Sequence, residues 1–102
     1  MADDARAAES PELRRLRRRI DALDRKIVGL LNDRLELGRA VGHEKSAAGR
    51  RVVRDAERER EVLLRVTMAN TGPMPQAELL AIYRRLIRIT RSLEERDRER
   101  SG

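Results

Sequence analysis

The chain has 102 residues and no cysteine, which suits one domain and excludes disulfide bridges and thiolate metal sites. Its one histidine excludes a multi-histidine metal cluster, and its single aromatic residue requires an aliphatic core, which favours helices packed on helices. The net charge of +6 fits an arginine-rich proteome, but equally an anionic small substrate, a nucleic acid or an acidic protein surface as partner.

The first expected helix follows a polar, alanine-rich segment, residues 1–10, which we expect to form a flexible tail. Ser10 suits the N-cap position and Pro11 the first helical position. From there to about Ser46 the apolar residues alternate between spacings of three and four, the heptad pattern of a helix that packs along one seam. The seam consists of Leu13, Leu16, Ile20, Leu23, Ile27, Leu30, Leu37 and Val41.

Such a helix would be roughly 50 Å long at a rise of ~1.5 Å per residue. A compact domain of this size has a radius of gyration of only ~13 Å. Because the domain cannot cover this helix by itself, we expect a homodimer or a higher oligomer that shares it. Glycines inside the seam indicate close packing at Gly29, Gly38 and Gly42.

A second helix is expected from about Val53 to Asn70, after a connector at residues 47–51. The glycine and two prolines at residues 71–75 end it. Its apolar stripe is interrupted by a charge at Glu59.

A third helix is expected to begin near Pro75 and to reach a charged segment, residues 97–102, which we expect to fray. No strand pattern is recognisable, so the predicted fold is all-α, with three helices in one domain over residues 11–96. No apolar run approaches the ~20 residues of a membrane span, and no secretory signal follows Met1, which predicts a cytoplasmic protein without a membrane partner.

Two charged residues stand where the heptad pattern calls for apolar ones, Arg34 in the first helix and Glu59 in the second. Burying a charge is costly unless it is paired or bound, so these residues either form a buried ion pair or line a polar pocket. Lys45 follows Arg34 by eleven residues, about three turns, and so shares its face. Arg17 lies nearly five turns before Arg34 on a different face, from which it reaches a partner's pocket more easily than its own.

Asp55, Arg58 and Glu59 are spaced i, i+3 and i+4, which places them on one helix face. They form either a solvated ladder of ion pairs or part of a cationic pocket with a carboxylate that accepts a hydroxyl. Arginine suits such a pocket because its planar fork grips carboxylates in two places. The ligand expected is a small polyanion, since no phosphate-binding loop or dinucleotide fingerprint is present.

Four segments, residues 16–24, 30–34, 41–45 and 53–59, resemble the all-helical chorismate mutases. The first three read LRRRIDALD, LLNDR and VGHEK and are similar to that family's first helix, and the fourth, VRDAERE, is similar to the start of its second. The resemblance covers about residues 11–95. It implies a three-helix chain that forms an intertwined helical homodimer, with an arginine from the partner subunit completing each of two active sites.

The resemblance implies roles for the candidate residues. Arg17 is the arginine given to the partner's site. Arg34 and Lys45 grip the substrate carboxylates, and Lys45 also reaches the ether oxygen. Glu59 and Asp55 orient the ring hydroxyl, Asp55 through its backbone.

By the same resemblance, Arg58 lines the pocket. The family's third helix often carries a serine and, four residues later, a glutamine, where this chain has Thr90 and Glu94. Thr90 can keep the hydroxyl and backbone contacts, whereas Glu94 can donate a hydrogen bond only when it is protonated. Apolar neighbours and a bound dianion would raise the pKa of Glu94 and Lys45 would lower it, and the sequence leaves that balance open.

The reaction implied is the concerted Claisen rearrangement of chorismate to prephenate in aromatic amino acid biosynthesis, which needs no cofactor, metal or nucleophile. Alternatives on the same fold are a mutase of 4-amino-4-deoxychorismate and an isochorismate pyruvate lyase. A basic helical module that binds nucleic acid is disfavoured, because acidic residues interleave with the basic ones and no aromatic platform exists. A purely structural coiled coil leaves Arg34 and Glu59 unexplained.

Overall fold

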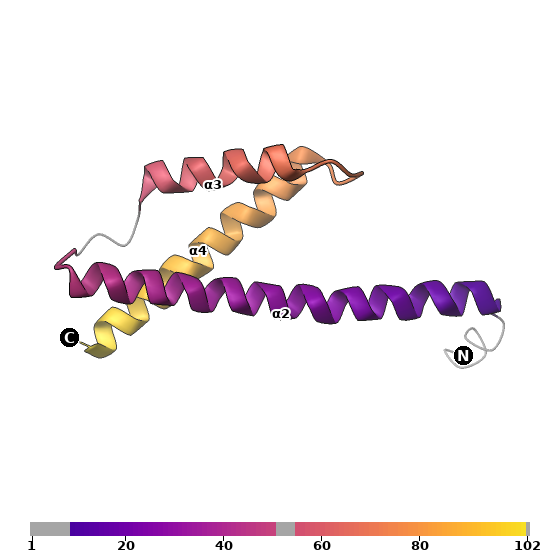
Figure 1. Ribbon diagram of the computed structural model, residues 1–102, viewed down its shortest axis with the longest axis horizontal. Coiled ribbons are helices and arrows are strands. Elements are labelled where there is room, and N and C mark those ends of the chain that lie inside the picture. Colours follow the sequence, from indigo (N-terminus) through magenta and orange to yellow (C-terminus); the bar gives the residue numbers. More distant parts are fainter. Residues whose placement is uncertain (1–8, 51–54, 102) are drawn as a thin grey trace. The chain divides into compact units, whose positions relative to one another are not determined.

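The computed structural model describes residues 9–50 and 55–101, and these contain helices and loops but no strand. The helices are α2 (Pro11–Ala47), α3 (Ala56–Ala69) and α4 (Gln76–Ser101) (Figure 1). The prediction of an all-α fold with a long first helix is confirmed. Most of the expected tail, residues 1–8, lies outside the described residues.

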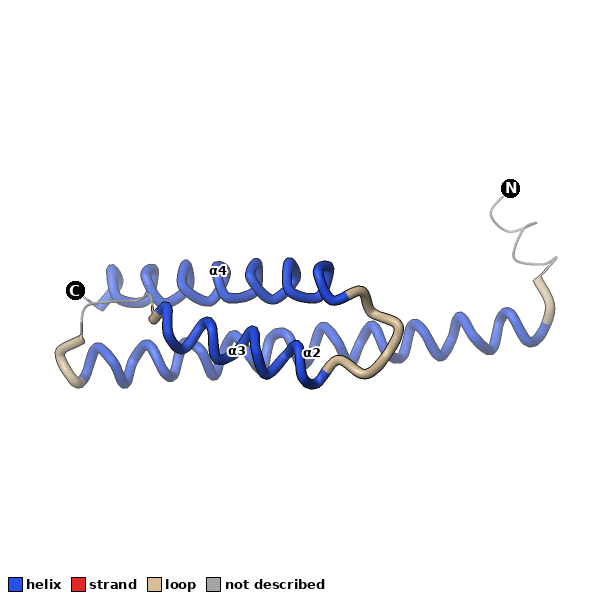
Figure 2. Tube along the Cα trace, turned by 90° about the horizontal axis from the view of Figure 1, so that it is seen from above, coloured by secondary structure: helices blue, strands red, loops and turns tan. Residues whose placement is uncertain are grey.

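The chain divides into two compact units after residue 34, and α2 continues across this boundary. The first unit, residues 1–34, holds the N-terminal part of α2. The second unit, residues 35–102, holds the C-terminal part of α2 with α3 and α4. Within the second unit α3 packs against α4 (Figure 2).

Hydrogen bonds at both ends of α2 explain where this helix starts and stops. The Ser10 hydroxyl oxygen accepts a hydrogen bond from the backbone N–H of Leu13 at 3.1 Å, which confirms the predicted N-cap. After the last turn, Gly49 has a φ of 79°, a left-handed conformation that glycine adopts without steric strain. Its N–H donates to the carbonyl of Ser46 at 3.0 Å and so closes the helix end.

α3 begins later than expected because Asp55 is its N-cap. The Asp55 backbone is extended (φ −122°, ψ 91°), and its carboxylate accepts a hydrogen bond from the Arg58 N–H at 3.0 Å. The first helical residue is therefore Ala56, whereas the sequence favoured a start near Val53, which lies outside the described residues. Asp55 thus precedes the helical face that carries Arg58 and Glu59.

Amide side chains hold the connection between α3 and α4. The Asn70 amide donates to the Met74 carbonyl at 2.9 Å and to the Gln76 side-chain oxygen at 2.8 Å. The Gln76 amide donates in turn to the Thr67 carbonyl at 3.3 Å. α4 starts at Gln76, one residue after the expected Pro75.

Two glycines let α2 and α4 approach each other in the second unit. A Cβ atom on Gly38 would overlap the Thr90 methyl group, and one on Gly42 would lie 2.8 Å from Glu94 Cγ. The expected close packing is confirmed at both positions, whereas a Cβ on Gly29 would meet nothing within 4 Å. Thr90 and Glu94 are therefore pressed against the backbone of α2.

The apolar seam of α2 is exposed along its length. Exposed fractions run from 38% at Leu13 to 69% at Leu37, with the other seam residues between these values. Among the described residues only Leu86 and Ile87 are buried. The seam is an uncovered packing surface within the single chain. In the part of the chain that the structure describes, no helix has the length and apolar character needed to cross a bilayer.

Candidate active site

The predicted site residues fall in both units. The first unit contains two of them, Arg17 and Arg34. The second unit contains Lys45, Asp55, Arg58, Glu59, Thr90 and Glu94. In the first unit the Arg17 guanidinium pairs with the Glu9 carboxylate, and Arg34 is partly buried.

Three candidate residues lie where α2 and α4 approach each other: Lys45 on α2, and Thr90 and Glu94 on α4. The Thr90 hydroxyl donates to the Leu86 carbonyl at 2.8 Å, which leaves the hydroxyl oxygen able to accept. Partial burial raises the pKa of the Glu94 carboxyl, the Lys45 ammonium lowers it, and the charges of Asp97 and Glu95 raise it. In the unliganded chain the raising influences prevail, so the pKa of Glu94 lies above its ordinary value. The further rise that a bound dianion would cause stays a prediction.

A pocket of ≈ 280 Å³ lies between α3 and α4. It is lined by Ala56, Glu59, Arg60, Leu63, Arg84, Ile87, Arg88 and Arg91. Glu59 Oε2 is 4.0 Å from Arg91 Nε, and the two side chains are 19% and 25% exposed. The Glu59 carboxylate is thus held at the wall of a mainly cationic pocket.

Arg58 and Asp55 are occupied by local contacts at the start of α3. Arg58 is exposed and its guanidinium lies 3.6 Å from the Glu61 carboxylate, an ordinary surface ion pair. The Asp55 carboxylate caps the helix, and the Asp55 carbonyl accepts the Glu59 N–H at 3.0 Å. The carboxylate and the carbonyl of Asp55 are thus both engaged within α3, and the backbone contact with a ligand that the resemblance implies stays a prediction.

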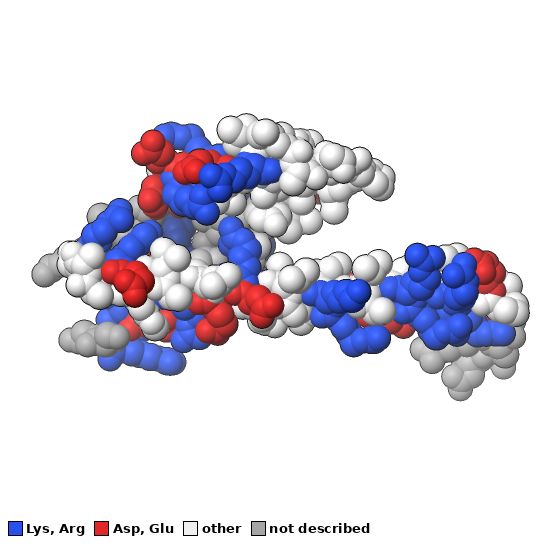
Figure 3. Space-filling view, viewed as in Figure 1, with Lys and Arg blue, Asp and Glu red and all other residues white. Residues whose placement is uncertain are grey.

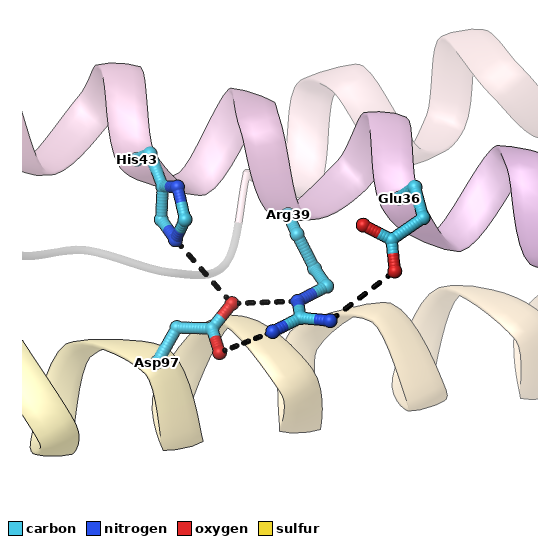
Figure 4. Close-up of polar contacts among 4 residues, drawn as sticks. All are labelled: Glu36, Arg39, His43 and Asp97. Atoms are coloured by element: carbon cyan, nitrogen blue, oxygen red, sulfur yellow. Dashed lines mark hydrogen bonds and ion pairs between the residues drawn. The ribbon is translucent and has the colours of Figure 1, made fainter.

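A second polar cluster, which the sequence analysis did not identify, joins α2 to the C-terminal part of α4 (Figure 4). Arg39 donates to both carboxylate oxygens of Asp97, at 2.9 Å and 3.0 Å, and also pairs with Glu36 at 3.2 Å. His43 Nε2 lies 3.5 Å from the same Asp97 carboxylate. The Asp97 side chain is only 11% exposed. α4 is helical to Ser101, through the segment that we expected to fray.

Replacing Asp97 with asparagine is expected to lower the melting temperature at neutral pH, because the substitution removes the charge that Arg39 binds. Hydrogen bonds from Arg39 hold the pKa of Asp97 below its ordinary value. The stabilisation is therefore complete above the unfolded-state pKa of Asp97 and is lost as pH falls through the folded-state pKa.

The measurement is the melting temperature of wild type and Asp97→Asn as a function of pH. The two melting temperatures should converge as pH falls through the acidic range below the unfolded-state pKa of Asp97. Glu99→Gln, on the same helix, is the control; a constant difference between wild type and Asp97→Asn across that range would contradict the prediction.

Positive charge gathers at the N-terminal part of α2 (Figure 3). A pocket of ≈ 470 Å³ there is lined by Glu9, Arg14, Arg17, Arg18, Ile20 and Asp21. Arginines also gather in the pocket between α3 and α4. Its arginines on α4 have a signal in the sequence that we did not use: Arg84, Arg88 and Arg91 are spaced by four and then three, which defines one helix face.

Comparison with known proteins relates this arrangement to one family. The family described as chorismate mutase type II matches residues 16–95. The bifunctional chorismate mutase/prephenate dehydratase of Aquifex aeolicus (strain VF5) is 38% identical over 89 residues, which are 83% of this chain and 24% of that protein. The enzyme of the same description from Stutzerimonas stutzeri is 32% identical over 92 residues, 86% of this chain and 25% of that protein. The chain thus spans about a quarter of the length of these curated relatives.

Two solved structures are similar along nearly their whole length. Form II of the chorismate mutase from Thermus thermophilus has a TM-score of 0.77 and 29% identity, with 83% of this chain and 96% of that chain covered. Form I of the same enzyme has a TM-score of 0.72 and 26% identity, with 78% and 98% covered.

Proposed function

This chain belongs to the chorismate mutase type II family, and we propose that it catalyses the rearrangement of chorismate to prephenate. The observation that carries the proposal is the extent of the family match. Residues 16–95 include every candidate site residue, from Arg17 to Glu94. The likeness to a chorismate mutase of which 96% is covered supports it further.

The proposed mechanism is electrostatic and geometric. Arg34 and Lys45 bind the two carboxylates of the substrate, together with Arg17 of a second copy, and so hold the flexible dianion in its reactive shape. In the transition state the breaking ether oxygen gains negative charge, which Lys45 and a protonated Glu94 stabilise by donating hydrogen bonds. The partial burial of Glu94, which raises its pKa, supports this second role.

The remaining candidates orient the ring. The Glu59 carboxylate accepts the ring hydroxyl, and the Asp55 backbone contacts the same group. Thr90 provides its hydroxyl oxygen from α4, and Arg58, as the family resemblance implies, lines the substrate pocket and contributes positive charge. None of these groups forms a covalent bond to the substrate, so the protein needs no nucleophile for this chemistry.

A homodimer that intertwines its α2 helices is part of the proposal. The uncovered seam, from Leu13 to Val41, supports it, because a long apolar stripe, here interrupted only at Arg34, is stabilised by burial against a second helix. The same pairing carries Arg17 to the partner's site. Location in the cytoplasm and the lack of a nucleic-acid partner remain predictions from the sequence.

The direct test is to mix the purified chain with chorismate and to follow the loss of its ultraviolet absorbance together with the formation of prephenate. 4-Amino-4-deoxychorismate and isochorismate are assayed in parallel, the latter for release of pyruvate. The proposal expects the highest kcat/KM with chorismate. A higher kcat/KM with either other substrate would reassign the site within the fold, and no turnover of any of them would overturn the enzymatic function.

Glu94→Gln is expected to keep its activity to higher pH than the wild type. Because the pKa of Glu94 is raised, its protonated form persists to higher pH than that of an ordinary glutamate, and the ability to donate to the ether oxygen is lost as pH rises through that pKa. A glutamine donates at every pH. The measurement is a pair of profiles of kcat against pH, with Glu99→Gln as the control because Glu99 is exposed on the same helix and is not among the charges that shift the pKa of Glu94. Superimposable profiles for wild type and Glu94→Gln would remove Glu94 from the chemistry.

A further inference from the structure

Arg91 is the one residue in the described part of the chain with a solvent-shielded side-chain nitrogen that has no hydrogen-bond partner. Its Nε lies 4.0 Å from Glu59 Oε2, which is within range of charge attraction but too long for a hydrogen bond. Buried donors are nearly always satisfied in folded proteins, and the exceptions call for an explanation. A shift of about 1 Å between the two side chains would convert this contact into a hydrogen bond.

The surroundings of this pair are strongly cationic. The pocket wall carries Arg60, Arg84, Arg88 and Arg91 and a single acid, Glu59. Such a wall favours an anionic ligand, and the only carboxylate in it is the one that Arg91 approaches. Because the Glu59 and Arg91 side chains are each at least three-quarters covered, water screens their attraction less than it would at the surface.

We propose that Arg91 is a positioning residue of the substrate site, which holds the Glu59 carboxylate in place to accept the hydroxyl of an anionic substrate. When the hydroxyl engages one carboxylate oxygen of Glu59, the other oxygen closes on the Arg91 Nε–H and satisfies it. Arg91 therefore acts through Glu59 rather than by touching the reacting atoms. This inference rests on the function proposed above and adds Arg91 to the residues that the sequence indicated.

The test is a double-mutant cycle in the full chain with chorismate as substrate. Arg91→Met removes the charge but keeps most of the aliphatic length, and Arg91→Lys keeps the charge. Each is made in the wild type and in a Glu59→Gln background, and kcat, KM and the melting temperature are measured. Arg85→Met is the matched control, because Arg85 is exposed on the same helix and lies outside the pocket.

Arg91→Met is expected to lower kcat/KM by about 10²-fold, the typical effect of misplacing a catalytic group. Arg91→Lys should recover part of this loss. In the Glu59→Gln background, where there is no carboxylate to position, Arg91→Met should change kcat/KM by no more than about twofold, the usual scatter between independent substitutions.

Three outcomes would overturn the inference. An unchanged kcat/KM with a lowered melting temperature would make Arg91 purely structural. An equal loss in both backgrounds, mainly in KM, would make it a direct ligand of the substrate. If Arg91→Met fails to fold, a loss of kcat/KM in Arg91→Lys that is equally large in the wild-type and Glu59→Gln backgrounds would exclude action through Glu59. Wild type and Arg85→Met report separately on the proposed function: if both are active and Arg91→Met matches them, only the inference about Arg91 fails.

Discussion

Arg34→Ala and Lys45→Ala should each lower kcat by about 10²–10³-fold, the usual cost of removing one preorganised charge from a transition state. Both side chains are partly buried in the structure, and the Lys45 charge acts on Glu94. The expectation is that neither substitution lowers the melting temperature much, because a cation whose main role is to bind a ligand contributes little to the unliganded fold.

The competing hypothesis is that Arg34 belongs to a buried structural ion pair. Removing one partner of such a pair typically costs about 3–5 kcal/mol of unfolding free energy, which would appear as a large fall in melting temperature. Measuring kcat and thermal unfolding on the same preparations separates the two. Arg25→Ala and Lys26→Ala are matched controls, since both are exposed on α2 outside its seam. Wild-type turnover in Arg34→Ala or Lys45→Ala would remove that residue from the site.

Two inactive variants are expected to restore activity when they share a dimer. In a heterodimer of Arg17→Ala with Arg34→Ala, one site loses both arginines and the other regains both. Random pairing makes half of the dimers mixed, each with one intact site of two, so about a quarter of wild-type activity should return. The chains are refolded together and heterodimers are verified by mass spectrometry before assay.

The control for this experiment combines Arg34→Ala with Lys45→Ala. Both residues are proposed to act in the site of their own subunit, so each site of the mixed dimer still lacks one cation and activity should stay low. Verified heterodimers of Arg17→Ala with Arg34→Ala that show no recovery would refute the shared site.

The helices could be predicted from the sequence because their signals are local. The alternating seam and the Ser10 cap defined α2, and the glycine and prolines at residues 71–75 separated α3 from α4. The start of α3 was placed too early because the apolar stripe continues across Asp55, whose backbone is extended. Aspartate, like serine, is a preferred N-cap residue, so the sequence carried a signal for this start that periodicity alone does not report.

The contacts between helices were harder to predict. Gly38 and Gly42 indicated a close approach, but only the fold identifies Thr90 and Glu94 as their neighbours. The Arg39–Asp97 pair joins residues far apart in the chain, and neither residue breaks a heptad pattern. The spacing of Arg91 from Arg84 and Arg88 is visible in the sequence. Its contact with Glu59, however, depends on the register of α3 against α4.

The sparse core has a consequence for how the protein exists in a cell. A chain whose described residues include only two buried side chains, Leu86 and Ile87, has little to hold it folded in isolation. If a second copy covers the α2 seam, folding and association are one bimolecular event, and stability depends on protein concentration. Dilution then shifts the equilibrium toward unfolded monomers, and subunits exchange only through unfolded chains. The concentration of the protein in the cell would therefore set the fraction of chains that have a complete active site.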